Sequence, residues 1–150
     1  MHIVLYEPEI PPNTGNIARL CAATGIQLHL VGRLGFRLDD RHLRRAGLDY
    51  WPHVQWLRHH SLEDLQLWAG PEARYFYFTK TGTAPYTQPA YRWGDFLVFG
   101  SETKGLPRAL LESNAGHVLT IPMFGPVRSL NLSTSVGIVA YEALRQIKGF

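Results

Sequence analysis

Residues 2–31, HIVLYEPEIPPNTGNIARLCAATGIQLHLV, decide the fold of this chain. Residues 2–6 form an apolar, β-branched run, which predicts a buried strand. A second strand is predicted for residues 27–31. A proline-rich turn and a helical stretch lie between them, so the segment is a strand–helix–strand unit in which the two strands run parallel.

The helix of this unit is bounded by residues with opposite backbone preferences. Three prolines in residues 7–12 exclude helix there, because proline lacks the backbone donor that a helix uses. We therefore expect Asn13 or Thr14 to cap the helix. Gly25 is expected to close it, since glycine adopts the left-handed conformation at helix ends.

The rest of the chain continues to alternate strands and helices. Further strands are predicted for residues 53–57, 74–79, 95–99 and 118–121. Further helices are predicted for residues 39–47, 61–70 and 132–148. This alternation predicts an α/β fold with a mostly parallel sheet and helices on both faces. Because the 150 residues contain no repeat or linker, we expect one domain, residues 1–150.

Composition and cysteine usage exclude several classes of protein. Hydrophobic residues make up 45% and charged residues 18%, which is too apolar for a disordered chain. No aliphatic run is long enough to span a membrane, and the N-terminus lacks the basic leader of a targeting peptide. The lone cysteine, Cys21, cannot form an internal disulfide, so we expect a cytoplasmic protein. Its apolar neighbours favour a buried residue over a nucleophile.

The basic residues indicate an anionic partner. The net charge is +3, and 12 of the 15 basic residues are arginine, whose planar fork suits phosphates. Five arginines fall within 13 residues: Arg33, Arg37, Arg41, Arg44 and Arg45. Asp39 and Asp40 lie beside them, so one interpretation is a solvated helix face with local ion pairs. The other is a phosphate-contacting patch of a nucleic-acid-binding protein.

Three loops are richer in glycine and proline than a simple connection requires. They are residues 79–91, 100–107 and 122–131, and each follows a predicted strand. In open α/β sheets, ligands gather at the carboxyl ends of strands. We therefore expect the functional site to be built from these three loops.

Several common catalytic and nucleotide-binding motifs are absent from the sequence. Residues 100–105, GSETKG, are not followed by the Lys-Ser or Lys-Thr pair of a phosphate-binding loop. The first strand-to-helix turn has no Gly-x-Gly-x-x-Gly, which argues against a dinucleotide site. No Gly-x-Ser-x-Gly elbow is present. The seven histidines show no metal-ligand spacing, so no metal is expected.

What remains is a pocket with few titratable groups. Gly100 and Gly105 allow the backbone to approach a ligand closely. The segment Ile121-Pro122-Met123 offers apolar walls and free backbone groups. Glu102, the one carboxylate of its loop, either orients a polar group or caps the following turn. Such a pocket suits a flat, partly apolar ligand such as an adenine nucleoside.

Three segments, in this order, resemble the signature motifs of the SPOUT methyltransferases. They are NTGNIAR at 13–19, FGSETKGLP at 99–107, and IPM with RSLNLS at 121–123 and 128–133. The resemblance runs from Ile3 to the C-terminal helix and implies a deep trefoil knot in the C-terminal half. Residues 3–13 and 44–50 resemble one branch, the short tRNA ribose 2′-O-methyltransferases that act at the wobble nucleotide of leucine tRNAs.

The resemblance implies S-adenosylmethionine as the cofactor. The implied contacts are Tyr77, Gly100, Ile121 and Ser129, with Glu102, Met123 and Leu130 close to them in the sequence. The pocket expected from the glycines and apolar residues agrees with that ligand. Residues 78–81, FTKT, depart from the branch, in which small polar residues run into a lysine and a glycine.

The resemblance also assigns a catalytic role to the arginine that matches Arg19. Asn16 and Arg19 are three residues apart, so they share a helix face near an N-terminus that attracts phosphate. A guanidinium stays protonated in proteins, so we interpret Arg19 as a phosphate clamp and a stabiliser of the oxyanion. Tyr141 corresponds to a tyrosine implicated in substrate binding or catalysis, and the alternative is a core aromatic residue. The residues expected to contact the RNA are Arg41, Arg44, Arg45 and Asn131.

The last predicted helix is apolar on more than one face. One face carries Leu132, Val136, Val139 and Ala143, and other faces carry Ile138, Ala140 and Tyr141. Such a helix must be buried on more than one side, and a subunit interface is the natural second cover. The resemblance likewise implies a homodimer with the site at the interface. Glutamate at Val136 and Val139 is then expected to give monomers.

The sequence therefore predicts an S-adenosylmethionine-dependent enzyme that methylates the wobble ribose of leucine tRNAs and binds the anticodon stem-loop. Two alternatives stay open: ribose methylation of another tRNA or rRNA site, and an RNA-binding protein without catalysis. The presence of Arg19, Gly100, Ser129 and Asn131 argues against lost catalysis. Because the first strand begins at His2, we expect no N-terminal RNA-binding extension, and the RNA is expected to bridge two subunits.

Overall fold

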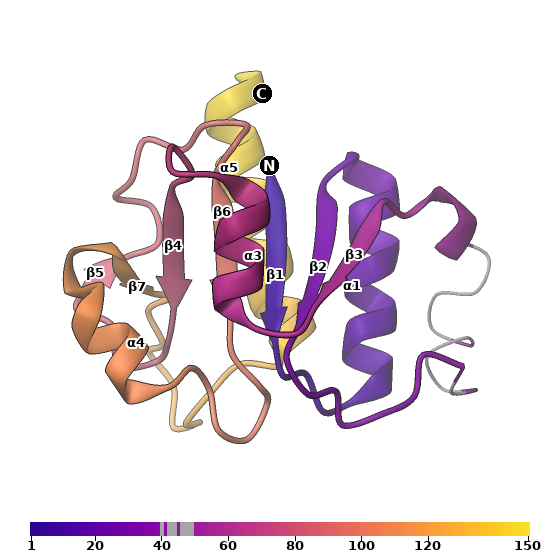
Figure 1. Cartoon of the computed structure of the whole chain (residues 1–150). Helices are drawn as coiled ribbons and strands as arrows, with labels where there is room; N and C mark the ends of the chain where they lie inside the picture. Colours follow the sequence, from indigo (N-terminus) through magenta and orange to yellow (C-terminus); the bar gives the residue numbers. More distant parts are fainter. Residues whose placement is uncertain (40, 42–44, 46–49) are drawn as a thin grey trace.

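The computed structural model describes residues 1–39, 41, 45 and 50–150. Within these residues, seven strands form one sheet in the order β3-β2-β1-β6-β4-β7-β5 (Figure 1). Their bounds are β1 His2–Tyr6, β2 Gln27–Val31, β3 Trp56–His59, β4 Tyr75–Phe78, β5 Ala84–Pro85, β6 Phe96–Phe99 and β7 Val118–Thr120. Since every pairing is parallel, the carboxyl ends of the strands lie at one edge of the sheet.

Helices cover both faces of this sheet, because the strands are apolar on both sides. The helices α1 (Pro11–Thr24) and α5 (Leu132–Lys148) pack against each other and against the face that carries Ile3. The helices α3 (Leu62–Ala69) and α4 (Arg108–Ser113) cover the face that carries Val4 (Figure 1). The predicted α/β fold with a parallel sheet covered on both faces is confirmed.

The first helix begins earlier than predicted. It starts at Pro11 with Ile10 as its N-cap, so the expectation that proline excludes helix from residues 7–12 is wrong for Pro11 and Pro12. Proline is tolerated in the first turn because its missing N–H would have no partner inside the helix. The helix ends as expected at Gly25, whose φ of 72° is left-handed.

Two other elements differ from the prediction. Residues 51–53 form a short 3₁₀ helix, η1 (Trp51–His53), so β3 begins at Trp56 and not at residue 53. The strand β5 lies inside the predicted loop 79–91, and its two residues are too few to show an alternating pattern. The helix predicted for residues 39–47 lies mostly outside the described residues.

The last helix has the predicted bounds, but its most apolar face is covered within the subunit. Val136 and Val139 are fully buried in the core that α5 shares with α1 and the sheet. The expectation that glutamate at these positions gives monomers is therefore wrong, because a carboxylate there would disrupt each subunit's own core. On the other side of α5, Tyr141 is 49% exposed and Ile138 is partly exposed.

Cys21 is buried in α1, as expected, and burial raises the pKa of its thiol to about 12. A thiol with this pKa stays protonated at neutral pH, so Cys21 is not a nucleophile in the folded protein. No helix in the described parts of the chain is long and apolar enough to cross a membrane.

Three histidines on neighbouring strands form a hydrogen-bonded row beneath α3. Nδ1 of His2 lies 3.0 Å from Nε2 of His29, and Nδ1 of His29 lies 2.9 Å from Nε2 of His59. Trp68 of α3 packs on all three rings, at centroid distances between 5.0 and 5.9 Å. Burial lowers the pKa of His2 to about 4 and that of His29 to about 3, so both are neutral at pH 7.

This row makes stability depend on pH. An imidazole with a lowered folded-state pKa stabilises the fold fully above the unfolded pKa of 6.5, and the stabilisation is lost as pH falls from there. We expect the free energy of unfolding to drop between pH 7 and pH 5, with about 2 kcal/mol of the drop coming from His29. Urea unfolding at the two pH values measures this drop. In the variant His29→Gln, the drop in the free energy of unfolding should be smaller by the contribution of His29. An identical pH dependence in variant and wild type would contradict the role given to His29.

Candidate functional site

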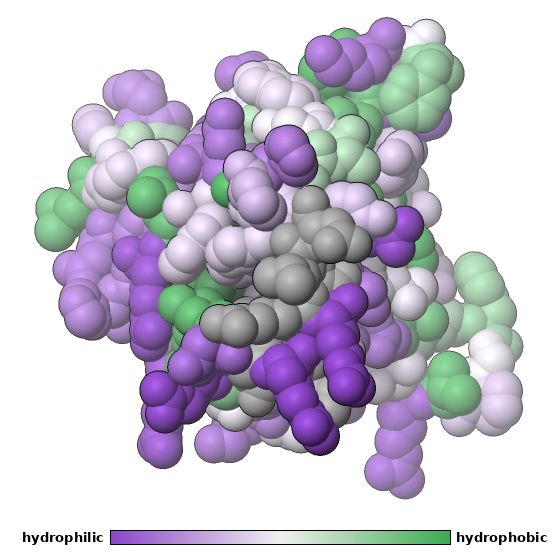
Figure 2. Space-filling model, turned by 90° about the vertical axis from the view of Figure 1, so that its right-hand side faces the viewer, coloured by the Kyte–Doolittle hydropathy of each residue, from purple (hydrophilic) through white to green (hydrophobic). Residues whose placement is uncertain are grey.

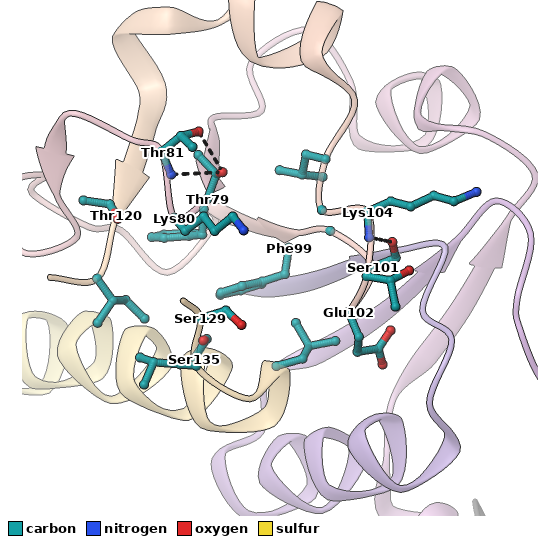
Figure 3. A pocket seen from close by; sticks show the side chains of 18 of the residues that line it. Thr79, Lys80, Thr81, Phe99, Ser101, Glu102, Lys104, Thr120, Ser129 and Ser135 are labelled. Carbon is teal, nitrogen blue, oxygen red and sulfur yellow. Dashed lines mark hydrogen bonds between the residues drawn. The ribbon is translucent and has the colours of Figure 1, made fainter. Parts of the chain in front are cut away.

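A cavity of about 680 Å³ opens at the carboxyl edge of the sheet (Figure 3). Its walls come from residues 79–81, 100–106 and 121–131, so all three predicted loops meet there, as expected. The cavity brings together most of the predicted cofactor contacts and one predicted RNA contact: Gly100, Glu102, Ile121, Met123, Ser129, Leu130 and Asn131.

The wall at β4 differs from what the sequence indicated. Tyr77 does not line the cavity, because its side chain is 2% exposed and packs on the sheet face beneath α3 and α4. Side chains alternate along a strand, so Phe78 faces the cavity instead. Cavity residues outside the three predicted loops, which the sequence did not indicate, include Phe78, Arg108, Leu111, Thr120 and Ser135. The position of Thr120 at the end of a strand is the signal that could have identified it.

The loop after β6 folds back on itself and requires glycine at its base. A β-bridge joins Ser101 to Gly105, whose N–H donates to the Ser101 carbonyl at 2.9 Å and whose φ of 65° is left-handed. A Cβ atom on Gly100 would lie 2.1 Å from the carbonyl carbon of Gly105 and 2.3 Å from the nitrogen of Leu106. Gly100 is therefore needed for the close backbone contact and Gly105 for the left-handed turn, and together they shape one cavity wall.

The Glu102 carboxylate ties this loop to the start of α1, towards which it points in Figure 3. It accepts hydrogen bonds from the backbone N–H of Glu9 at 2.7 Å and of Ile10 at 3.1 Å, and from the Asn13 amide at 3.4 Å. The Thr103 hydroxyl adds a second tie by donating to the Glu9 carboxylate at 2.7 Å, which lowers the pKa of Glu9. Glu102 therefore does not cap the following turn; it holds the two residues that precede α1 and orients the polar amide of Asn13.

Asn131 links the start of α5 to the same place. Its side-chain oxygen caps α5 by accepting from the backbone N–H of Ser133 at 2.9 Å and of Thr134 at 3.3 Å. Its amide donates to Oδ1 of Asn13 at 3.0 Å. Asn13, which is 6% exposed, thus bridges Asn131 and Glu102, and we call these three residues the junction. The role expected for Asn131 in RNA binding stays a prediction.

The predicted catalytic residues lie outside the cavity of their own subunit. Asn16 and Arg19 are both exposed on α1, as their spacing predicted, and Tyr141 is exposed on α5, against which α1 packs. The described residues that line the cavity include Ile10 and Asn13 at the start of α1, but none of these three. One subunit therefore assembles the loops of the cavity without bringing Asn16, Arg19 or Tyr141 to them.

The basic cluster is exposed where the structure describes it. Exposed arginines of the cluster are Arg33, Arg37, Arg41 and Arg45, and Arg44 lies outside the described residues. On this side of the molecule, hydrophilic side chains gather next to the grey residues (Figure 2). Arg37 pairs with Asp39 at 3.2 Å, and both side chains are largely exposed. Such an exposed pair is weak, so it leaves the arginine able to exchange to a phosphate.

The cavity carries little net charge. Arg108 pairs with Glu112 at 2.7 Å and Lys104 points away from the cavity, whereas Lys80 points into it (Figure 3). The remaining described lining is mostly apolar or hydroxyl-bearing, which suits a partly apolar ligand better than a triphosphate. In the described parts of the chain, no group of three or more His, Cys, Asp or Glu side chains is arranged to hold a metal ion.

The chain matches the profile of the SpoU rRNA Methylase family over residues 1–141. The chain belongs to this family. A Bacillus subtilis relative is 52% identical over 149 residues, which cover 97% of this chain and 92% of the relative. An Escherichia coli K12 protein named tRNA (cytidine(34)-2′-O)-methyltransferase is 49% identical over 148 residues, covering 98% of this chain and 94% of that protein.

Solved structures agree with this membership. A structure described as giving insight into the 2-OH methylation of C/U34 on tRNA has a TM-score of 0.93 and 51% identity, covering 99% of this chain and 97% of that one. An AdoMet-bound rRNA methyltransferase from Sinorhizobium meliloti has a TM-score of 0.81 and 28% identity, and the match covers 96% of this chain and 55% of that one. Family membership confirms the resemblance stated from the sequence, the methyltransferase activity, and S-adenosylmethionine as the methyl donor of the family.

Replacing Gly100 tests whether the tight loop shapes the cofactor site. In Gly100→Ala the added methyl group meets the backbone of Gly105 and Leu106 between 2.1 and 2.5 Å, so the loop must shift. We expect calorimetry to show an affinity for S-adenosylmethionine about tenfold weaker or worse. Gly116→Ala is the matched control, because nothing lies within 4 Å of its Cβ position. Undiminished affinity in Gly100→Ala would place the cofactor elsewhere.

Proposed function

We propose that this protein transfers a methyl group from S-adenosylmethionine to the ribose 2′-hydroxyl of the wobble nucleotide of leucine tRNAs. The observation that carries the proposal is the match, over 98% of this chain and 94% of the relative, to a protein named for this reaction at cytidine 34. The cavity built from three loops supports it by offering a cofactor site. We also propose that residues 1–150 act as one domain, in the cytoplasm with the tRNA.

The cavity residues fit this cofactor. Apolar walls for the adenine ring and the methionine chain are provided by Ile121, Met123 and Leu130. The Ser129 hydroxyl and the backbone beside Gly100 offer polar contacts, and Lys80 offers a cation to a carboxylate. Glu102 holds the loop in place, and Tyr77 supports the strand that carries this wall from behind. When bound, S-adenosylmethionine supplies a methyl group activated by its sulfonium.

Asn16 and Arg19 act on the RNA. Because its guanidinium stays protonated, Arg19 donates hydrogen bonds to an RNA phosphate and stabilises the negative charge that develops on the 2′-oxygen. Asn16 lies one turn earlier on the same exposed face and offers its amide to the sugar–phosphate chain. The exposed arginines Arg41 and Arg45, together with Arg44, hold the anticodon stem-loop through its phosphates.

The placement of these residues supports a homodimer. Since Asn16, Arg19 and Tyr141 lie outside their own cavity, we propose that they face the cavity of the second subunit. The helices α1 and α5 pack together, so their exposed faces form one surface. Ile138 and Tyr141 make this surface apolar enough to be buried by a second copy. RNA held by one subunit would then reach the cofactor of the other.

We also propose the trefoil knot that the family resemblance implies. Close backbone contacts in the C-terminal half support it. A Cβ atom on Gly82 would lie 2.6 Å from the carbonyl carbon of Leu119, so these two segments touch backbone to backbone. The strand β5 pairs with β7 on the side away from β4, which brings loop 79–91 across the end of the sheet.

Ribose methylation of rRNA is the second candidate. The matching family is named for rRNA methylases, and the Sinorhizobium meliloti neighbour is an rRNA methyltransferase. This chain covers 55% of that neighbour but 94% of the Escherichia coli tRNA methyltransferase. The sequence identity is 49% to the Escherichia coli tRNA methyltransferase and 28% to the rRNA methyltransferase, which favours tRNA as the substrate.

Methylation assays decide between these substrates. The purified protein with S-adenosylmethionine should place one 2′-O-methyl group on the wobble nucleotide of leucine tRNAs, as measured by mass spectrometry of nuclease fragments. Arg19→Ala should lower kcat by about a hundredfold or more, because it removes a donor to the developing oxyanion, and should leave cofactor affinity unchanged. Methylation of rRNA but not of tRNA would overturn the proposed substrate. An unchanged kcat in Arg19→Ala would overturn the role of the arginine.

The dimer is tested by placing a charge on the exposed side of α5. Ile138→Glu puts a carboxylate into the proposed interface, where it would have no partner, so sedimentation should show monomers that lack methylation activity. Leu67→Glu is the matched control, because Leu67 is 83% exposed on α3, away from α1 and α5. A dimeric and fully active Ile138→Glu protein would contradict the proposed interface.

A further inference from the structure

The Arg19 side chain is held by an aromatic ring. Its guanidinium carbon lies 4.7 Å from the centroid of the Tyr50 ring, a cation–π contact. Among the described residues, no hydrogen bond or ion pair engages the Arg19 guanidinium, although the side chain is exposed. Stacking uses the face of the guanidinium and leaves the N–H donors at its edge available to an anion.

The backbone of Tyr50 is held in place by the residues that follow it. The 3₁₀ helix η1 follows it directly and packs against α1, and the His53 N–H donates to the Tyr50 carbonyl at 2.9 Å. Trp51 packs against the core, with its ring centroid 5.1 Å from that of Trp56 on β3. The Tyr50 backbone is therefore anchored to the sheet through η1, and its ring reaches Arg19 from outside α1.

We propose that Tyr50 is a positioning residue that holds Arg19 ready for the RNA. This inference rests on the proposed function, in which Arg19 binds a phosphate and stabilises the oxyanion. An exposed arginine without the ring would sample many rotamers, and ordering it on substrate binding would cost conformational entropy. Stacking on the Tyr50 ring restricts the rotamers of Arg19 before the RNA binds, so less conformational entropy is lost on binding. It also fixes the direction of the N–H donors.

We expect methylation activity to depend on the aromatic ring of Tyr50 and not on its hydroxyl group. Tyr50→Phe keeps the stacking surface and is expected to retain activity. Tyr50→Leu and Tyr50→Met keep apolar packing but lack the ring, and should lower kcat/KM by about twofold to thirtyfold with an unchanged melting temperature. Using both variants protects the test against one that fails to fold. Trp93→Leu is the matched control, since it removes the cation–π contact with Lys148, at 5.2 Å, near the C-terminus of α5.

A double-mutant cycle separates positioning from a structural role. If Tyr50 acts through Arg19, then Tyr50→Leu in an Arg19→Ala background should cause no further loss, whereas a structural role gives additive losses. Binding of tRNA without cofactor gives a second readout. Arg19→Ala should lower the slope of log K against log salt by about one, while Tyr50→Leu weakens binding but keeps the slope, because the charge is still present.

The outcomes distinguish this inference from the proposed function. Inactivity of the wild type on leucine tRNA would overturn the function itself. An active wild type with an impaired Arg19→Ala variant, but full activity in Tyr50→Leu and Tyr50→Met, would overturn only the inference about Tyr50. Equal loss of activity in Tyr50→Phe and Tyr50→Leu, or additive losses in the double-mutant cycle with Arg19→Ala, would also overturn only the inference about Tyr50.

Discussion

The hydrogen bonds among Glu102, Asn13 and Asn131 join three parts of the chain that are 89 and 118 residues apart in the sequence. Two of these residues also accept hydrogen bonds from the backbone. Glu102 accepts from the N–H of Ile10, the N-cap of α1, and Asn131 accepts from the N–H of Thr134 in the first turn of α5. A partly dismantled network of this kind leaves polar groups without partners, which costs more than one lost hydrogen bond. The loop after β6 and the starts of α1 and α5 therefore keep a fixed relation, and the cavity between them depends on it.

The same junction determines where the rest of α1 points. Its first turn closes the cavity through Ile10 and Asn13, while the following turns present Asn16 and Arg19 outward beside α5. A subunit built in this way has its proposed cofactor cavity in one place and its proposed RNA-facing groups in another. The proposed homodimer resolves that separation, because a second copy can bring its own α1 to the cavity. Tyr50 adds to this arrangement by holding Arg19 before any partner or RNA is bound.

Much of this was predictable from the sequence, and the failures have physical reasons. The bounds of β1, β2 and α5 were predicted correctly because their apolar residues are bounded by turn-forming residues, and loop composition after strand ends identified the three walls of the cavity. The start of α1 was predicted too late, because Pro11 and Pro12 were taken to exclude helix although the first turn of a helix tolerates proline. Tyr77 was expected from the family resemblance alone, and the strand of four aromatic residues did not show that Phe78 faces the cavity instead. Val136 and Val139 were assigned to a subunit interface because an apolar helix face does not reveal which neighbour covers it.

Mixing two inactive variants tests most directly whether the active site is shared between subunits. Arg19→Ala subunits keep an intact cavity, and Gly100→Val subunits keep Arg19 but lose the cavity, so neither homodimer should methylate tRNA. After the two are exchanged into mixed dimers, each mixed dimer would hold one complete site, and random mixing should restore about a quarter of the wild-type activity. Mixed dimers that form, as shown by sedimentation of differently labelled subunits, yet remain inactive would contradict a site shared between two subunits.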